Sequence, residues 1–300
     1  MAVENYNKVK QVLWLILFAN LLVAILKILA GTIIRSASLT ADGFHSLSDG
    51  SSNIVGLIGI SIASKPVDED HHYGHRKYES LASLVIAGML FIIGGNILAN
   101  SISRFFNPII PKVSLESLII LIATLIINVF VCSLEYKQGK ALNSEILVSD
   151  SKHTRSDIYI SAGVLVSLAC IKLGLPAIID PIASLVVAGF IFYASYEIFS
   201  TTSGILVDKA VLDTDKIRQI VNGFSQVKNI HKIRCRGDEN DVYIDMHVVT
   251  EPDMNVEQSH ELIHSIEKKL RQETNKNIQL IAHFEPFENN TDDSISNDSV

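Results

Sequence analysis

The chain has 300 residues, 48% of them hydrophobic and only 19% charged, and its formal net charge is −7. No basic patch interrupts this acidic balance, so nucleic acid is excluded as an expected partner. The averages hide a division near residue 207, because long apolar runs come before it and a polar, charged segment follows.

The first part of the chain, residues 1–207, predicts an α-helical membrane domain with six transmembrane helices. A helix needs about 20 mostly apolar residues to cross the hydrocarbon core of a bilayer. The first run is long enough to span and no signal-peptidase-like site follows it, so we expect no cleavable signal peptide. The predicted spans are 11–33, 38–64, 79–103, 114–135, 144–172 and 177–203.

Loop lysines and arginines predict the orientation, because basic residues gather on the cytoplasmic side of a membrane. The predicted loops on one side carry about twice as many of them as the loops on the other. We therefore expect a multi-pass protein of the cell (plasma or inner) membrane, with both termini in the cytoplasm. The basic residues on the richer side are Lys8, Lys10, Lys65, Arg76, Lys77, Lys137, Lys140 and Lys209.

The second and fifth segments each carry a histidine followed four residues later by an aspartate: His45 and Asp49, then His153 and Asp157. Residues at this spacing share one face of a helix. Ionisable groups within a bilayer usually face a polar path or the protein interior. Two such HxxxD pairs turned toward each other supply two imidazoles and two carboxylates, which suit a tetrahedral divalent transition metal. We therefore predict a metal site midway across the membrane.

The loop 65–78, KPVDEDHHYGHRKY, gathers further candidate ligands in a segment that we expect on the cytoplasmic side. A solvated acidic loop with chance histidines is the plain alternative to a metal site there. The candidates are Asp68, Asp70, His71, His72 and His75.

Residues 208–288 predict a small soluble α+β domain of α-β-β-α-β order. Helical spacing of apolar residues indicates helices at 213–227 and 255–272, and period-two alternation indicates strands at 229–236, 241–249 and 277–285. A domain of this size is marginal by itself, and a dimer would help to stabilise it. The tail 289–300 is acidic and poor in apolar residues, so we expect it to be disordered.

Taken together, these motifs resemble the cation diffusion facilitators, a family of divalent-metal/proton antiporters, and most of all the bacterial branch that exports zinc and ferrous iron. The resemblance covers nearly the whole chain. It implies a ferredoxin-like fold for the soluble domain, and a homodimer. Its motifs are HSLSD in the second segment, GHRKYES opening the third, HTRSD in the fifth, and the histidine-bearing domain that follows.

The resemblance also implies two further metal sites. In the loop, Asp68, His71 and His75 match an Asp and two His of the family. In the soluble domain, four histidines match a binuclear zinc site, at which Glu285 stands where the family branch has Asp. His264, one turn after one of them, is an extra candidate. The four matching histidines are His231, His247, His260 and His283.

The function that we expect is zinc/proton antiport by alternating access, with no enzymatic activity. Protons compete with metal for imidazole and carboxylate lone pairs, and histidine exchanges protons near physiological pH. A second imidazole, from His45, favours zinc over harder cations such as manganese. Zinc is expected as cargo and as a structural or regulatory ion. Cadmium, cobalt, ferrous iron and manganese stay open as alternative cargoes.

Other classes of protein fit less well. An intramembrane metalloprotease needs a general base beside an open metal site, as in HExxH, and the sequence has no such motif. A membrane-anchored metal sensor or storage protein would explain the soluble ligands but not six membrane helices with a polar central pair. A passive channel with four ligands at one site would hold the metal too tightly for fast conduction.

Overall fold

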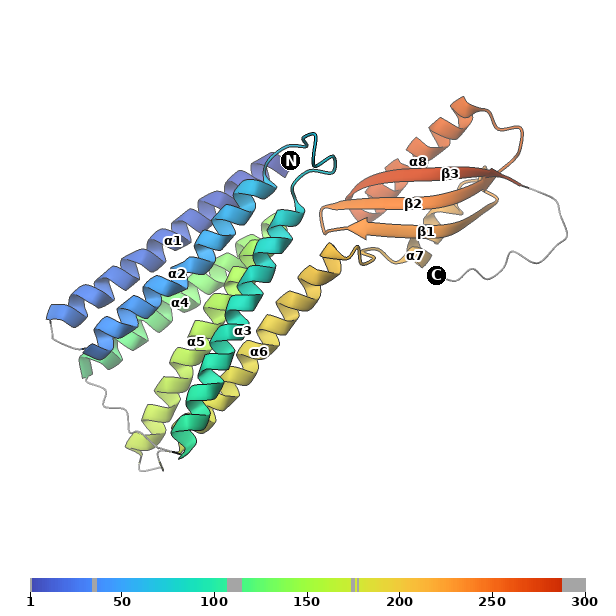
Figure 1. Cartoon of the computed structure of the whole chain (residues 1–300). Coiled ribbons are helices and arrows are strands. Elements are labelled where there is room, and N and C mark those ends of the chain that lie inside the picture. The colour runs from blue at the N-terminus through green and yellow to red at the C-terminus, as the bar shows by residue number, and fades with distance from the viewer. Residues whose placement is uncertain (1, 34–36, 107–114, 174–175, 177, 288–300) are drawn as a thin grey trace. The chain divides into compact units, whose positions relative to one another are not determined.

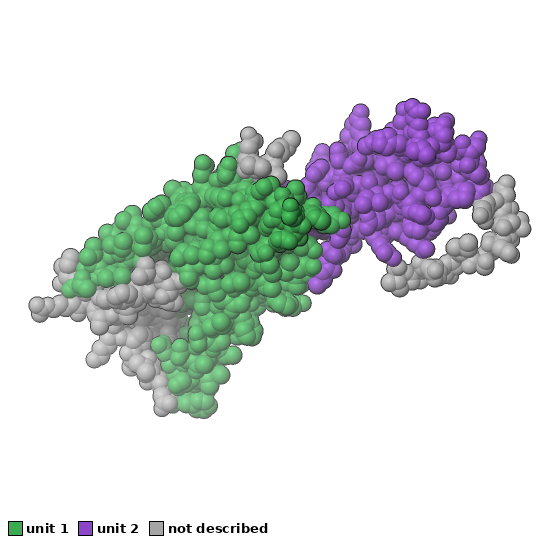
Figure 2. Space-filling model, turned by 45° about the horizontal axis from the view of Figure 1, so that its top comes forward, with its two compact units in different colours: residues 1–206 green, residues 207–300 purple. Residues whose placement is uncertain are grey.

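A computed structural model describes residues 2–33, 37–106, 115–173, 176 and 178–287, and the predicted disordered tail, 289–300, lies outside them (Figure 1). The chain divides into two compact units, Met1–Leu206 and Val207–Val300 (Figure 2). Each unit has its own fold and its own core.

Within the described residues, the first unit consists of six long helices. Three stretches among those residues are long and apolar enough to cross a membrane: Tyr6–Leu26, Lys77–Phe106 and Pro181–Leu206. The helices are α1 (Ala2–Ile33), α2 (Ala37–Ala63), α3 (Lys77–Phe106), α4 (Leu115–Leu142), α5 (Glu145–Lys172) and α6 (Ile179–Leu206).

The outside of this helical unit is apolar. Large hydrophobic side chains on several helices are more than half exposed, among them Phe18, Phe91, Phe130 and Tyr193. An exposed apolar surface of this kind marks a membrane or partner interaction. Several polar residues, by contrast, lie in the interior. The fully buried ones include Asn53, Glu135, Asp150 and His153.

Helices α2 and α5 pack side by side in opposite directions, as the expected central pair. A Cβ added at Gly56 or Gly59 of α2 would lie 2.9 Å or 3.1 Å from the Ile146 side chain of α5. Further down α2, the side-chain amide of Asn53 donates a hydrogen bond to Asp150 of α5. Residue numbers fall along α2 as they rise along α5, so the helices are antiparallel. Small residues permit this close approach.

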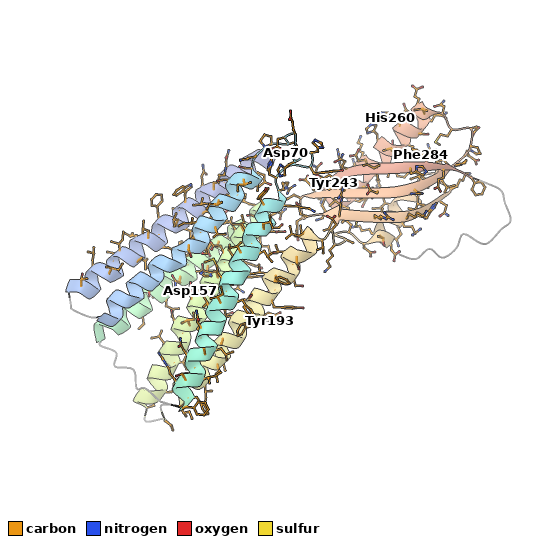
Figure 3. All side chains as sticks on the ribbon, viewed as in Figure 1. Asp70, Asp157, Tyr193, Tyr243, His260 and Phe284 are labelled. Carbon is orange, nitrogen blue, oxygen red and sulfur yellow. The ribbon has the colours of Figure 1, made fainter. Side chains whose placement is uncertain are left out.

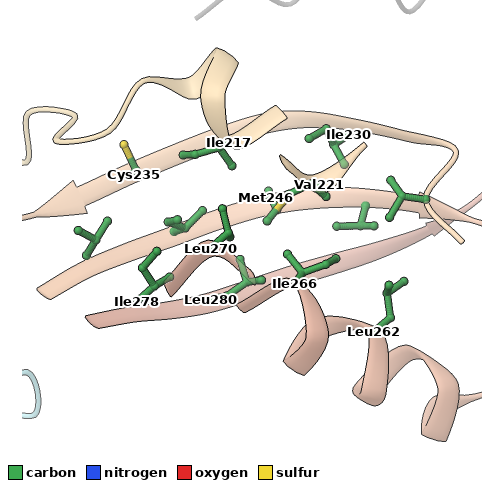
Figure 4. Packing of buried hydrophobic residues seen from close by; sticks show 14 residues of the cluster. Ile217, Val221, Ile230, Cys235, Met246, Leu262, Ile266, Leu270, Ile278 and Leu280 are labelled. Atoms are coloured by element: carbon green, nitrogen blue, oxygen red, sulfur yellow. The ribbon is translucent and has the colours of Figure 1, made fainter. Parts of the chain in front are cut away.

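The second unit is a two-layer α+β domain, as predicted. Its three-stranded sheet has the order β1-β2-β3, in which β1 and β2 are antiparallel and β2 and β3 are parallel. Both helices cover one face of the sheet (Figure 4). The elements are α7 (Thr214–Val221), β1 (Asn229–Gly237), β2 (Asp241–Thr250), α8 (Val256–Thr274) and β3 (Asn277–Pro286).

The predicted helix 213–227 is too long. Asp213 caps the N-terminus of α7, accepting a hydrogen bond from the Asp215 N–H, but the helix ends at Val221. Asn222 and Gly223 follow, and these residues favour turns over helix. Phe224 and Val227 continue the helical spacing of apolar residues, but they pack in the core from the turn that follows the helix.

The core of the domain lies between the helices and one face of the sheet. Side chains alternate along the strands, so the buried set shares one face. The other face of the sheet carries the polar and titratable residues, including all the strand histidines. The buried set is Ile217, Val221, Val227, Ile230, Cys235, Val242, Ile244, Met246, Val248, Leu262, Ile266, Leu270, Ile278 and Leu280.

Candidate metal sites

The membrane HxxxD pairs lie on α2 and α5. His45 and Asp49 belong to α2, but their side chains lie outside the described part of the chain. On α5, His153 is 2% exposed and Asp157 is half-buried, partway along the helix (Figure 3). The second pair therefore lies at an interior position of a helix packed against α2.

Because α2 and α5 are antiparallel, the two HxxxD pairs lie at a similar height along the helix axes. Asn53 and Asp150 are bonded to each other and serve as a reference level. The first pair lies four and eight residues before Asn53, and the second lies three and seven residues after Asp150. In antiparallel helices these two steps run in the same direction. At about 1.5 Å per residue, both pairs are displaced from the reference by about 4 to 12 Å.

A buried polar network next to these pairs was not predicted from the sequence. The Asn20 amide of α1 donates to the Asn53 side-chain carbonyl at 2.9 Å, and the Asn53 amide donates to Asp150. Glu135 of α4 is also completely buried and lies close enough to Asp150 for the two carboxyl groups to interact. The sequence signal that could have predicted this network is the presence of polar residues in apolar segments, because such residues usually face the protein interior.

A second unpredicted contact fixes the start of α5. Glu79 of α3 is buried, and its carboxylate accepts hydrogen bonds from the Ser144 hydroxyl at 2.6 Å and the Ile146 N–H at 3.4 Å. The neighbouring Ser80 hydroxyl donates to Glu145 at 2.8 Å. Because first-turn N–H groups of a helix lack intrahelical partners, Glu79 serves as a cap supplied by another helix.

The loop between α2 and α3 brings three of its candidate ligands together. Asp68 Oδ1 lies 3.1 Å from His71 Nδ1, and Asp68 Oδ2 lies 3.2 Å from His75 Nε2. The two imidazole rings are 4.2 Å apart, and His75 is buried. One ligand atom from each residue lies within 4.8 Å of the others. Asp70 and His72 are not in this group, as the resemblance implies.

The Asp68 carboxylate of this loop group stays ionised to a lower pH than an ordinary aspartate does. Partial desolvation opposes the charge, but hydrogen bonds from the His71 ring and N–H, with the nearby His75 ring, set the pKa of Asp68 below its ordinary value. The His75 ring is also oriented by a contact of its Nδ1 with the Pro66 carbonyl oxygen at 3.1 Å. An oriented imidazole beside an ionised carboxylate is an arrangement that metal sites use.

The open face of the sheet aligns three histidines across its strands. His231 of β1 pairs in register with His247 of β2, and His247 pairs with His283 of β3. The rings of successive histidines are 5.1 Å and 4.8 Å apart. Period-two alternation puts Glu285 on the same face as His283.

Glu285 lies among these histidines. Its Oε1 is 2.7 Å from His247 Nδ1 and 4.0 Å from His283 Nε2, while its Oε2 is 3.1 Å from His231 Nε2. The hydrogen bond with His247 lowers the pKa of Glu285, against partial desolvation and with help from the other two histidines. The longer glutamate side chain thus reaches two strands, in the manner of a bridging ligand.

His260 does not belong to this group within one chain. It lies on α8, which covers the opposite face of the sheet (Figure 3). Among the described residues, the groups with metal-ligand spacing are the loop triad and His231–His247–Glu285. The nearest titratable partner of His260 is His264, with the two Nε2 atoms 3.1 Å apart.

A helical unit that is apolar outside and polar within, joined to a domain with clustered metal ligands, defines a membrane metal transporter. Comparison of the sequence with models of known protein families supports this class. Residues 13–207 match the cation efflux transmembrane domain, and residues 211–287 match the cytoplasmic domain of cation efflux proteins. The chain belongs to the cation diffusion facilitator family of divalent metal cation efflux transporters. The predicted family, and the expectation that the protein is a transporter and not an enzyme, are confirmed.

Individual relatives cover most of the chain. An uncharacterized transporter of Methanocaldococcus jannaschii is 30% identical over 88% of this chain and 94% of its own length. The manganese efflux system protein MneP of Bacillus subtilis is 28% identical over 96% of this chain and 99% of its own. A second such protein, MneS, is 26% identical over 90% and 93%.

Proposed function

We propose that the protein is a zinc/proton antiporter that works by alternating access, with His45, Asp49, His153 and Asp157 as the transport site. The observation that carries this proposal is the level shared by the two HxxxD pairs on the antiparallel helices α2 and α5. Two imidazoles and two carboxylates form a complete tetrahedral set for a divalent metal.

The chemistry of the ligands couples metal binding to proton release. Metal binds only deprotonated imidazole and carboxylate, so each ion that enters displaces protons from the site. A site open to the cytoplasm loads metal, and a site open to the other side loses it to incoming protons. Alternating access requires a site that is never open to both sides at once, and the burial of His153 supports this. Rocking of one helix group against another supplies the switch.

Manganese is the second candidate cargo. Two relatives that span almost the whole chain are named manganese efflux system proteins. Manganese prefers oxygen ligands, whereas imidazole suits zinc. His45 and His153 give the site two imidazoles, and on this ground we favour zinc.

The remaining features fit a homodimer in the cell membrane, with six spans and both termini in the cytoplasm. The match to the cytoplasmic domain of cation efflux proteins supports the placement of residues 208–288. We assign His231, His247, His283 and Glu285 to a zinc site in this domain. The triad of Asp68, His71 and His75 then forms a second site at the loop.

The test is metal flux in proteoliposomes with an imposed pH gradient. Zinc, cadmium, cobalt, iron and manganese are compared in the wild type and in Asp49→Ala and Asp157→Ala. Both variants should lose zinc flux, whereas the control Asp70→Ala, which removes an exposed loop carboxylate, should keep it. Size-exclusion chromatography verifies that each variant is folded. Normal zinc flux in a folded Asp157→Ala variant would contradict the proposed transport site. Zinc flux that does not depend on the pH gradient would contradict proton antiport.

A further inference from the structure

Two acidic side chains, Glu135 of α4 and Asp150 of α5, lie close together in the interior of the helical unit. Glu135 is 0% exposed and Asp150 is 1% exposed. The two carboxyl groups are near enough to interact, and Asp157 also acts on Glu135 with a charge of the same sign. A buried charge is costly unless an opposite charge or hydrogen bonds compensate it. The surroundings of this acidic pair, Glu135 and Asp150, therefore decide what it binds.

Three oxygen atoms of the acidic pair have no hydrogen-bond partner among the described residues. They are both carboxyl oxygens of Glu135 and Oδ1 of Asp150. Asp150 Oδ2 accepts from the Asn53 amide. The neighbouring Thr154 hydroxyl donates to the Asp150 carbonyl oxygen at 3.2 Å, which leaves Glu135 without it. Because buried polar atoms nearly always have a partner, these three oxygens point to a ligand from outside the chain.

A divalent cation fits the charge and the atoms of the acidic pair. Two carboxylates balance its two charges, and carboxylate oxygens are preferred ligands of hard cations such as Mn²⁺ and Mg²⁺. Side chains nearby do not supply this charge. Lys152 is paired with Glu197 of α6 at 2.9 Å, and His153, which acts on Asp150, belongs to the proposed transport site.

The acidic pair lies between the proposed transport site and the helix ends that the proposed function places in the cytoplasm. Helix α4 ends at Leu142 and α5 begins at Glu145. Glu135 and Asp150 are seven and five residues from these ends, which is about 8 to 11 Å. His153 and Asp157 lie about 4 to 11 Å further along α5. Ionisable residues within a membrane commonly mark the path of an ion.

We propose that Glu135 and Asp150 form an entry site, at which a divalent cation binds through oxygen atoms before it passes to the transport site. The entry site rests on the proposed function for the position of the transport site and for the direction of travel. Carboxylate oxygens accept manganese as well as zinc, so the choice between these metals falls to the imidazoles of the transport site.

The experiment counts Mn²⁺ bound to purified full-length protein by equilibrium dialysis, at one alkaline pH because protons compete for the same oxygens. All variants carry Asp157→Ala, which disables the transport site. Adding Glu135→Gln, which keeps the shape but removes the charge, should remove one Mn²⁺ per chain. Adding Glu135→Asp should keep that ion. Adding Glu197→Gln is the matched control and should also keep it, because Glu197 is paired with Lys152.

An unchanged Mn²⁺ count after Glu135→Gln overturns the proposal, and so does an equal loss in the Glu197→Gln control. This comparison measures binding and not flux, so its outcome is separate from the flux test of the transport site. In the otherwise wild-type protein, Glu135→Gln should raise the metal concentration for half-maximal flux about tenfold with a nearly unchanged maximal rate, as loss of a binding contact does. If Glu135→Gln changes only the melting temperature, Glu135 is a structural residue and the proposal is wrong.

Discussion

The side-chain amide of Asn53 on α2 donates a hydrogen bond to the Asp150 carboxylate on α5, between the two helices that carry the HxxxD pairs. Both residues are completely buried, at 1% exposure each. The contact therefore sets the register of α2 against α5 one helical turn from the proposed transport site.

Asn53→Ala should destabilise the protein and slow metal transport. It leaves a buried Asp150 oxygen and the Asn20 amide without their partner, and an unsatisfied buried polar group costs about 1–3 kcal/mol. Thermal unfolding in detergent and proteoliposome flux are the measurements. Ile54→Ala, at a half-exposed position of the same helix turn, is the control and should leave both nearly unchanged. Equal effects of the two substitutions would deny a special role to this hydrogen bond.

Gly59→Ala should weaken the packing of α2 on α3. An added Cβ would lie 2.3 Å from the Ala82 Cβ, which is fixed to the α3 backbone, so a helix must shift. Overpacking of this kind typically costs about 1–3 kcal/mol. Gly88→Ala is the matched substitution, because a Cβ at Gly88 meets nothing within 4 Å. A melting temperature lowered only in Gly59→Ala is the expected result, and equal melting temperatures would contradict it.

His45→Asp should shift the selectivity of transport toward manganese or iron relative to zinc. The substitution replaces an imidazole by a carboxylate, and hard cations prefer oxygen ligands. The measurement is the ratio of manganese to zinc flux in vesicles under the same pH gradient. His72→Asp, which makes the same chemical change in the loop outside the described ligand groups, should leave the ratio unchanged. A constant ratio in His45→Asp would show that this residue does not choose the metal.

Zinc should stabilise the soluble domain through His231, His247, His283 and Glu285 on the open face of the sheet. A ligand that binds only the folded state contributes about 2.7 kcal/mol at 100 times its Kd. A chelator should accordingly lower the melting temperature of the full-length protein, and Glu285→Ala should remove most of the zinc-dependent shift. Glu285→Asp, which keeps the carboxylate, should preserve part of it. If the shift survives Glu285→Ala, the bound zinc that causes it lies elsewhere.

Glu285 should keep its negative charge to a lower pH than an ordinary glutamate does. The hydrogen bond with His247 lowers the pKa of Glu285 below its ordinary value of 4.5, so the carboxyl group is protonated only as the pH falls further. The stability that the charged carboxylate contributes is therefore present above about pH 4.5 and is lost as the pH falls through the lowered pKa. The measurement is the difference in melting temperature between the wild type and Glu285→Gln from about pH 7.5 downward. A difference that has already vanished above pH 4.5 would contradict the lowered pKa.

The sequence alone determined the features that depend on local spacing. The HxxxD pairs and the period-two strands each depend on residues that lie within a few positions of one another, so their pattern predicts the element and which residues share a face. The family followed from the same motifs and is confirmed. The end of α7 was missed because apolar spacing continued through Phe224 and Val227 although Asn222 and Gly223 had ended the helix.

The tertiary structure decided which of the candidate ligands meet. Asp68, His71 and His75 converge because one short loop carries them, whereas His260 is separated from the strand histidines because α8 covers the other face of the sheet. The partners of Asn53 and Glu79 lie 97 and 65 residues away in sequence. No local period encodes contacts of that range, because they exist only once the helices have packed and each buried polar group must find a partner.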